Sequence, residues 1–386
     1  MARYRAGRPR GAAWHAGRSA RPAAACQRPQ PFVPRPARLC LASDRRAGRL
    51  SGGQLAATAR SAVTRFCVIP KVELHCHLEG SIAPALAREL AARNGLDLPS
   101  GLFGADGHYV WRDFWSFLAA YDRVCTVLRT PRDFGDVIYS YLAGVAAEGA
   151  VYVEMFCSPE RPAALGISYA AWLAALAEGI DRAHREFGVV GRIIIICIRH
   201  LGPERALAMA EAMVAEPHPY VVGFGMGGDE AKLAPVDFAP AFRLAHDRGY
   251  GCTVHAGEVL GPESVWASIE ALPVTRIGHG VRSADDPALM DELVRRGTVL
   301  EVCPGSNIAL GLYRDRVAHP LHRLIDAGVS VTLNSDDPPF FHTTLGAEYD
   351  KAGLDAAALR RIARTAVKAS FADEATKHRL LTEISP

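Results

Sequence analysis

The 386-residue sequence has nine cysteines but no C-x-x-C pair and no regular cysteine spacing. This pattern argues against a disulfide framework and against a cysteine-based zinc site, and it favours a reducing compartment, so we expect a cytoplasmic protein. No apolar run approaches the ~20 residues that a membrane span needs, so we expect no membrane partner. The composition, 49% hydrophobic and 22% charged, is typical of a globular protein with a large core.

Acidic residues are almost absent from residues 1–66. This segment holds 14 Arg, no Lys and one acid, Asp44, so it contributes +13 to a chain whose net charge is +3. The rest of the chain therefore carries −10, and a basic surface for nucleic acid would depend on this leader alone. We expect no nucleic-acid partner.

The leader is rich in Arg, Pro and Ala and has no periodic apolar pattern, which predicts disorder. Its composition also fits an organelle transit peptide, although it has no secretory hydrophobic segment. A third interpretation is an upstream stretch included by a wrong start codon. In each case we expect residues 1–66 to lie outside the fold and residues 67–386 to form one domain.

A dinucleotide-binding fingerprint is also missing, because "GFGMGG" at 223–228 lacks the G-x-G-x-x-G spacing. Instead, eight short β-branched or apolar runs alternate with helical segments, which is the count for a (β/α)8 barrel. The first connection is long and includes the aromatic-rich "YVWRDFWSFLAAYDRVCTVL", which predicts a helical insert after strand one, serving as a lid or as extra packing. The runs span 72–77, 151–156, 192–200, 221–230, 252–258, 276–281, 299–304 and 329–337.

Polar residues gather where these strands end, which is the active-site face of such a barrel. Each has a plainer interpretation, since a single strand-end His is more often a hydrogen-bonded structural residue and an Asp pair often caps a helix. Their occurrence at the mouths of four strands is difficult to explain by chance. They are His75 and His77 in "KVELHCHLEG", His255 and Glu258, His279, and Asp336 and Asp337.

Three His and one Asp suit a catalytic divalent metal, because zinc takes nitrogen and oxygen ligands and leaves a position for water. Such a water has a pKa near ~7, so hydroxide is available at neutral pH. His279 and Glu258 then remain as an acid and base pair beside the metal. This combination points to hydrolysis.

The motifs resemble the adenosine deaminase family of metal-dependent amidohydrolases over residues 68–350. They occur in that family's order and include "PKVELHCHLEGS", "VYVEMFCSP", "GGDE", "HAGE", "RIGHGV", "LEVCP" and "VTLNSDDP". The resemblance implies one zinc ion per chain, bound by His75, His77, His255 and Asp336.

The same resemblance implies the roles of the other residues. His279 would help to deprotonate the water on the zinc and orient the hydroxide, and Glu258 would donate a proton to the purine N1. Asp337 would bond to N7, and the backbone of Gly228 would face N3. A helical gate over the apolar side of the pocket would contain Phe117, Leu118 and Tyr121, although these three could equally be a core stripe of the insert.

The substrate implied is a small adenine-type purine, with adenosine, converted to inosine and ammonia, as the main expectation and adenine or aminodeoxyfutalosine as alternatives. A binuclear amidohydrolase would need a carboxylated Lys at the end of strand four, where the run "ICIRH" offers Arg199 and His200. A non-catalytic purine-binding protein is a further alternative, which the intact Glu258, His279 and Asp336 oppose. Cytidine-type deaminases are excluded because they need C-x-x-C.

Glu79 departs from the best-known pattern of the resembled family. That pattern reads H-x-H-L-D-G, and its Asp accepts a hydrogen bond from the ribose 5′-hydroxyl, whereas this chain reads "HCHLEG". If strand geometry continues past His77, Glu79 points into the same pocket. The longer acid could still reach a 5′-hydroxyl, could serve another group in that place, or could face solvent.

Overall fold

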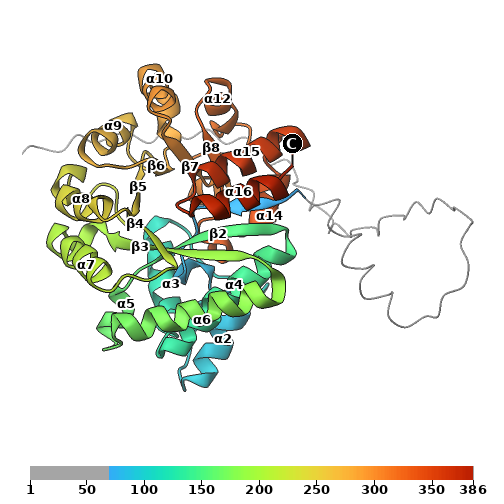
Figure 1. The fold of residues 1–386 in the computed structure, drawn as a ribbon. Helices are drawn as coiled ribbons and strands as arrows, with labels where there is room; N and C mark the ends of the chain where they lie inside the picture. Colours follow the sequence, from blue (N-terminus) through green and yellow to red (C-terminus); the bar gives the residue numbers. More distant parts are fainter. Residues whose placement is uncertain (1–68, 386) are drawn as a thin grey trace, which may run out of the picture. The chain divides into compact units, whose positions relative to one another are not determined.

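The computed structural model describes residues 69–385, which form a barrel of eight parallel strands in sequence order, β1 to β8 (Figure 1). An isolated parallel bridge between Cys76 and Asp336 joins the β1 side of the sheet to the β8 side. The predicted (β/α)8 barrel is confirmed. The strands are Lys71–Glu73, Ala150–Cys157, Val190–Ile198, Val221–Gly227, Gly251–Ala256, Arg276–His279, Val299–Val302 and Val331–Leu333.

Helices follow the strands and surround the barrel (Figure 1). The longer helices are α2 (Pro84–Arg93), α3 (Phe114–Cys125), α4 (Pro131–Ala147), α6 (Tyr169–Phe187), α7 (Pro203–Ala215), α8 (Ala239–Asp247), α9 (Pro262–Ala271), α10 (Pro287–Arg296), α15 (Ala356–Ala369) and α16 (Glu374–Glu383). The shorter ones are α5 (Glu160–Ala164), α11 (Pro304–Ala309), α12 (Leu321–Asp326), α13 (Pro338–Phe341) and α14 (Leu345–Asp350). Four 3₁₀ turns are described: η1 (Glu79–Ser81), η2 (Arg199–Leu201), η3 (Pro235–Phe238) and η4 (Val281–Asp285).

The connection between β1 and β2 contains the predicted helical insert. Its aromatic-rich part forms α3, which begins at a capping box in which Asp113 accepts from the backbone N–H of Ser116 at 2.8 Å. The Ser116 hydroxyl in turn accepts from the Asp113 N–H at 2.9 Å. These reciprocal bonds satisfy N–H groups that the first helical turn leaves free, so the helix starts at this point.

Several strands are shorter than the sequence predicted. β1 ends at Glu73, so His75 and His77 lie on the segment that follows it rather than in the strand. β8 similarly ends before Asp336. The run ending in "ICIRH" is β3, not the fourth strand, and β4 ends at Gly227, with Gly228 next. The position named for a carboxylated Lys was therefore assigned to the wrong strand, and no Lys occupies the end of β4 either.

The barrel interior combines an apolar layer with a buried ion network. Phe156, Ile194 and Ile196 pack together inside the barrel. Arg276 is fully buried and lies 2.6 Å from both Glu154 and Glu301. Buried charges persist in a fold only when they are paired in this way, so this network fixes the position of Glu301, which contacts the site described below.

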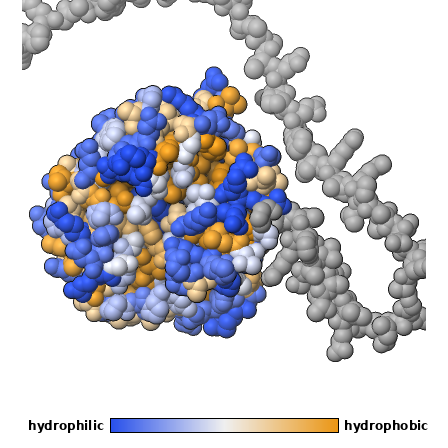
Figure 2. Space-filling view, turned by 45° about the horizontal axis from the view of Figure 1, so that its top comes forward, coloured by the Kyte–Doolittle hydropathy of each residue, from blue (hydrophilic) through white to orange (hydrophobic). Residues whose placement is uncertain are grey.

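The predicted leader, residues 1–66, lies outside the described residues, as do residues 67, 68 and 386 of the predicted domain. The face of the described part drawn in Figure 2 mixes hydrophilic areas with smaller hydrophobic ones. Within residues 69–385, every helix is too short or too polar to cross a lipid bilayer.

Candidate active site

Four side chains predicted as metal ligands meet at the carboxyl ends of the strands. His77 Nε2 lies 3.2 Å from His255 Nε2 and 3.3 Å from Asp336 Oδ1. His75 Nε2 lies 3.5 Å from the same oxygen of Asp336. Metal bonds of ~2.0–2.2 Å give a tetrahedral site edges of roughly 3.3–3.6 Å, so these three separations suit ligands around a single ion.

Hydrogen bonds orient two of the imidazoles for this purpose. His75 Nδ1 lies 2.8 Å from Glu301 Oε2, and His255 Nδ1 lies 2.9 Å from the carbonyl oxygen of Met226. Both partners accept, so each Nδ1 carries a proton, and a ring without a second proton presents the lone pair of Nε2 to the centre. The buried Nε2 of His75 makes no hydrogen bond. These residues fit a divalent cation.

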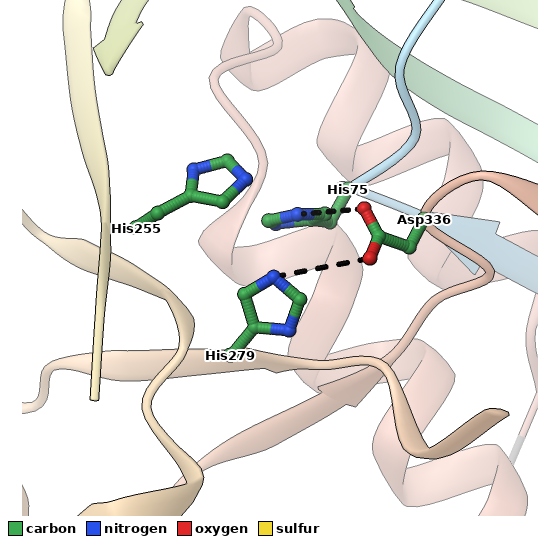
Figure 3. Close-up of side chains that lie close together, drawn as sticks. All are labelled: His75, His255, His279 and Asp336. Carbon is green, nitrogen blue, oxygen red and sulfur yellow. Dashed lines mark ion pairs between the residues drawn. The ribbon is translucent and has the colours of Figure 1, made fainter. Parts of the chain in front are cut away.

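His279 lies beside the four and completes a larger group. Figure 3 shows His75, His255, His279 and Asp336 converging, with ligand atoms all within 4.8 Å of one another. His279 Nε2 is 3.9 Å from Asp336 Oδ2 and 3.6 Å from Glu258 Oε2. It faces the second oxygen of Asp336, at a distance longer than a tetrahedral edge. The shorter distances of His77 favour His77 over His279 as the fourth ligand.

Burial and neighbouring charges strongly shift the pKa values of the residues in this cluster. Burial lowers the pKa of His75, but the carboxylates of Asp336 and Glu301 outweigh it and raise that pKa to about 10. Burial and the neighbouring imidazoles hold the pKa of His255 well below its usual range. Burial raises the pKa of Asp336, yet the neighbouring imidazoles of His75 and His77 outweigh burial and hold that pKa well below its usual range. A cation at this position would therefore compete with a proton on His75.

Two of these residues adopt strained backbone conformations. His279 has φ +57° and Asp336 has φ +64°, in the left-handed region that residues with a Cβ rarely occupy. Each such residue costs of order 1–3 kcal/mol and persists only where surrounding contacts enforce it. Backbone strain at two residues of one cluster is characteristic of a functional site.

Glu258 follows β5 on a loop that is held by Glu230. The carboxylate of Glu230 accepts from the backbone N–H groups of Glu258 at 3.2 Å, Val259 at 2.8 Å and Leu260 at 3.0 Å. It also accepts from the N–H of Gly257 and from a serine hydroxyl. Burial, with Asp336 and Glu230 nearby, raises the pKa of Glu258 well above its usual range. This shift favours the protonated form of Glu258.

The predicted substrate contacts line a cavity of about 930 Å³ that also contains His77, His255, Glu258 and Asp336. Glu79 lies in the turn η1 rather than on a continued strand, yet it is 94% buried, so it does not face solvent. Its Oε1 and the Oδ1 of Asp337 make no hydrogen bond. Asp337 precedes α13 without capping it through its side chain. Both carboxyl groups are thus free to contact a ligand.

Gly228 and the α3 residues form other walls of this cavity. Gly228 has φ +96°, and a Cβ there would lie 3.1 Å from His200 Nδ1, so the position requires glycine. Phe117 is buried against Phe340 and Phe341, which agrees with a core role, but it also lines the cavity. The cavity lining further includes Leu118 and Tyr121.

Glu230 and Glu301 were not predicted from the sequence. Both stood inside motifs that were recognised, "GGDE" and "LEVCP", but neither was assigned a role. Glu301 could have been found from its sequence context, since a carboxylate in the middle of an apolar strand needs a buried partner. Glu230 offered no comparable signal, because its donors, four on the loop after β5 and one on α9, are brought close only by the fold.

The adenosine deaminase family model matches residues 70–386. Among curated proteins, the chain is 47% identical to an adenine deaminase of Agrobacterium fabrum, over 81% of this chain and 97% of that protein. It is 44% identical to an adenine deaminase of Rhizobium johnstonii, over 82% of this chain and 99% of that protein.

Solved structures give a similar result. An adenine deaminase of Arthrobacter aurescens superimposes with a TM-score of 0.76 at 29% identity, covering 82% of this chain and 98% of that one. An amidohydrolase of Burkholderia ambifaria with bound zinc gives 0.74 at 26% identity, covering 86% and 94%. Family model, curated relatives and solved structures agree with the site geometry, and this chain, a hydrolytic deaminase, belongs to the adenosine deaminase family of metal-dependent amidohydrolases.

Proposed function

We propose that this enzyme hydrolyses adenine to hypoxanthine and ammonia. The observation that carries this proposal is the similarity to curated adenine deaminases over 97–99% of their length. Adenosine was the main expectation from the sequence and adenine an alternative. The relatives favour the alternative, and they support purine deamination in either case.

The chemistry of Glu79 also supports the free base. Adenine carries an N9–H donor, whereas N9 of adenosine is bonded to ribose. Glu79 presents a buried oxygen that makes no hydrogen bond, in the same cavity as the metal cluster. A buried acceptor left unpaired costs about 1–3 kcal/mol, so the site gains from a ligand that donates to it. We assign Glu79 as the acceptor of the N9–H.

We further propose one zinc ion per chain, held by His75, His77, His255 and Asp336. The three tetrahedral edges among these ligand atoms and the oriented Nε2 lone pairs support this set. When bound, the ion would lower the pKa of a water molecule to ~7 and so supply hydroxide at neutral pH.

The remaining residues bind and protonate the purine. Glu258, whose raised pKa favours the protonated form, donates to N1 and makes C6 electrophilic. Burial also raises the pKa of Asp337 well above its usual range, which favours the protonated form that donates to N7. The backbone N–H of Gly228 faces N3. A C6–O bond forms, the C6–N bond breaks, and the exocyclic nitrogen leaves as ammonia.

Four earlier predictions remain part of this proposal. The substrate is a small molecule, and neither nucleic acid nor a membrane is a partner. The cytoplasm is the proposed location, supported by six buried cysteines without disulfides among the described residues. Residues 1–66 are proposed to take no part in the reaction.

Product analysis tests the proposal. The purified chain, loaded with zinc, should convert adenine to hypoxanthine with one ammonia released per base. A strong chelator should abolish the conversion, and added zinc should restore it. Conversion of adenosine or aminodeoxyfutalosine with none of adenine would reject the proposed substrate, and turnover that survives verified metal removal would reject the proposed zinc.

A further inference from the structure

His279 is the last link in a chain of buried hydrogen bonds that begins at the backbone of α12. Asn307 Nδ2 lies 3.3 Å from His279 Nδ1. Asn307 Oδ1 lies 3.2 Å from His319 Nε2. His319 Nδ1 accepts from the backbone N–H of Leu321 at 3.2 Å. Leu321 is the first residue of α12, where a backbone N–H has no partner within the helix.

The backbone N–H at one end fixes the direction of every bond in this chain. An N–H can only donate, so His319 Nδ1 is unprotonated and the proton of its neutral ring lies on Nε2. That Nε2–H donates to Asn307 Oδ1, which directs the amide of Asn307 toward His279. The Asn307 N–H then donates to His279 Nδ1. His279 must therefore carry its own proton on Nε2.

Burial keeps water from replacing these hydrogen bonds, and burial with nearby charges keeps His319 from gaining the second proton that would reverse their direction. His279, Asn307 and His319 are 1%, 0% and 4% exposed, so solvent offers little alternative partner. Burial, with Arg316 and His322 nearby, lowers the pKa of His319 to about 4, so that ring is neutral at pH 7. A neutral His319 is required, since a protonated ring could not accept from Leu321.

We propose that Asn307 and His319 are positioning residues that hold His279 as its Nε2–H tautomer. In this tautomer the Nε2–H faces Asp336, whose Oδ2 lies 3.9 Å away, and Nε2 has no lone pair with which to bind a metal. The result agrees with the geometric preference for His77 as the fourth ligand. The family resemblance gave His279 two roles. The hydrogen-bond chain supports one, orientation of the oxygen nucleophile, and opposes the other, removal of a proton from the water, because Nε2 already carries a proton.

The tautomer can be measured without relying on catalysis. Nitrogen-15 NMR of histidine-labelled protein, with and without zinc, distinguishes a protonated from an unprotonated ring nitrogen, and a His279→Gln variant assigns the resonances. We expect Nε2 protonated and Nδ1 unprotonated at neutral pH. A proton on Nδ1 alone would overturn the proposal. Only the catalytic role of His279 rests on the proposed function, because this measurement requires no substrate.

Replacing the donor group of Asn307 with an acceptor tests whether Asn307 sets the tautomer of His279. Asn307→Asp replaces the donor with an acceptor of the same shape and should move a proton to Nδ1 of His279. Since a wrong histidine tautomer costs up to ~10⁴-fold in a hydrolase, we expect kcat on adenine to fall by roughly 10²- to 10⁴-fold. KM and bound zinc should change little. An unchanged tautomer with unchanged kcat would overturn the proposal.

A second variant covers the case in which Asn307→Asp does not fold. His319→Phe keeps a ring against Tyr313, whose centroid lies 5.0 Å from that of His319, but removes the anchoring bond to Leu321. We expect His279 to populate both tautomers. The matched control is His184→Gln, because His184 bonds to the carbonyl of Val189 and is not part of the hydrogen-bond chain. If His319→Phe and the control gave the same wild-type tautomer, the proposal would be wrong.

Discussion

The side chain of Glu230 accepts a hydrogen bond from the backbone N–H of Glu258 at 3.2 Å. This carboxylate accepts from four successive backbone N–H groups of the loop and from the Ser264 hydroxyl on α9, so it fixes the backbone from which the proposed acid projects. Its negative charge also contributes to the raised pKa of Glu258. The two residues therefore form a unit in which one positions the other and helps to raise its pKa.

Glu230→Gln should weaken this unit without removing the acid. The neutral amide binds the loop less well and removes one charge that raises the pKa of Glu258. The alkaline limb of the kcat/KM profile, where Glu258 loses its proton, should shift to lower pH. Turnover should fall by about 10-fold or more, as expected for lost bonds to a charged group. Ser264→Ala, which removes only one donor to Glu230, should leave the limb in place.

Glu258→Gln tests the proposed proton donor itself. The amide keeps the size of the side chain and leaves the four metal ligands intact, but it cannot donate an acid proton to N1. We expect kcat to fall by ~10²-fold or more with zinc content unchanged. Wild-type turnover in this variant would show that another group protonates the ring.

His255→Ala should behave differently, because it removes a metal ligand. Its Nε2 lies 3.2 Å from that of His77 in the proposed tetrahedral group. We expect zinc and activity to be lost together, measured by metal analysis after dialysis and by ammonia release. Zinc retained at one ion per chain would mean that the ligand set is wrong.

Glu79→Ala tests the contact that supports adenine as the substrate. Loss of a hydrogen bond to a carboxylate costs about 1.5–3 kcal/mol, so kcat/KM on adenine should fall roughly 10- to 150-fold. The matched substrate is 9-methyladenine, which has no N9–H and should lose little in the variant. An equal loss on both bases would show that Glu79 does not accept a hydrogen bond from N9–H.

Deletion of residues 1–66 should leave turnover and thermal unfolding essentially unchanged. The leader has no periodic apolar pattern with which to cover the barrel. Thermal unfolding and steady-state kinetics on the full and shortened chains provide the comparison. A large drop in unfolding temperature would show that the leader is part of the fold.

The barrel and the convergence of its His and Asp side chains were predictable because both depend on local patterns. Eight alternating runs predicted the strands, and polar residues at strand ends predicted that His75, His255 and Asp336 would meet. Strand lengths were less predictable. β1 ends at Glu73 because the segment after it pairs only through isolated bridges at Cys76 and His77, which residue pattern alone does not show.

Supporting residues around the site could not be found in the same way. Asn307 lies in a short helix and His319 precedes another, and nothing in the spacing of 12 residues between them indicates that their side chains meet. Their roles depend on bonds between loops that the barrel closes together. Such residues become visible only when donors and acceptors can be followed one by one.

The preference for adenine over adenosine is tested most directly by measuring kcat/KM for both on the same zinc-loaded preparation. Because Glu79 is assigned to the N9–H, which adenosine lacks, we predict at least ~10-fold higher kcat/KM for adenine. Equal values, or a higher value for adenosine, would contradict the account and return the ribose-contact role to Glu79.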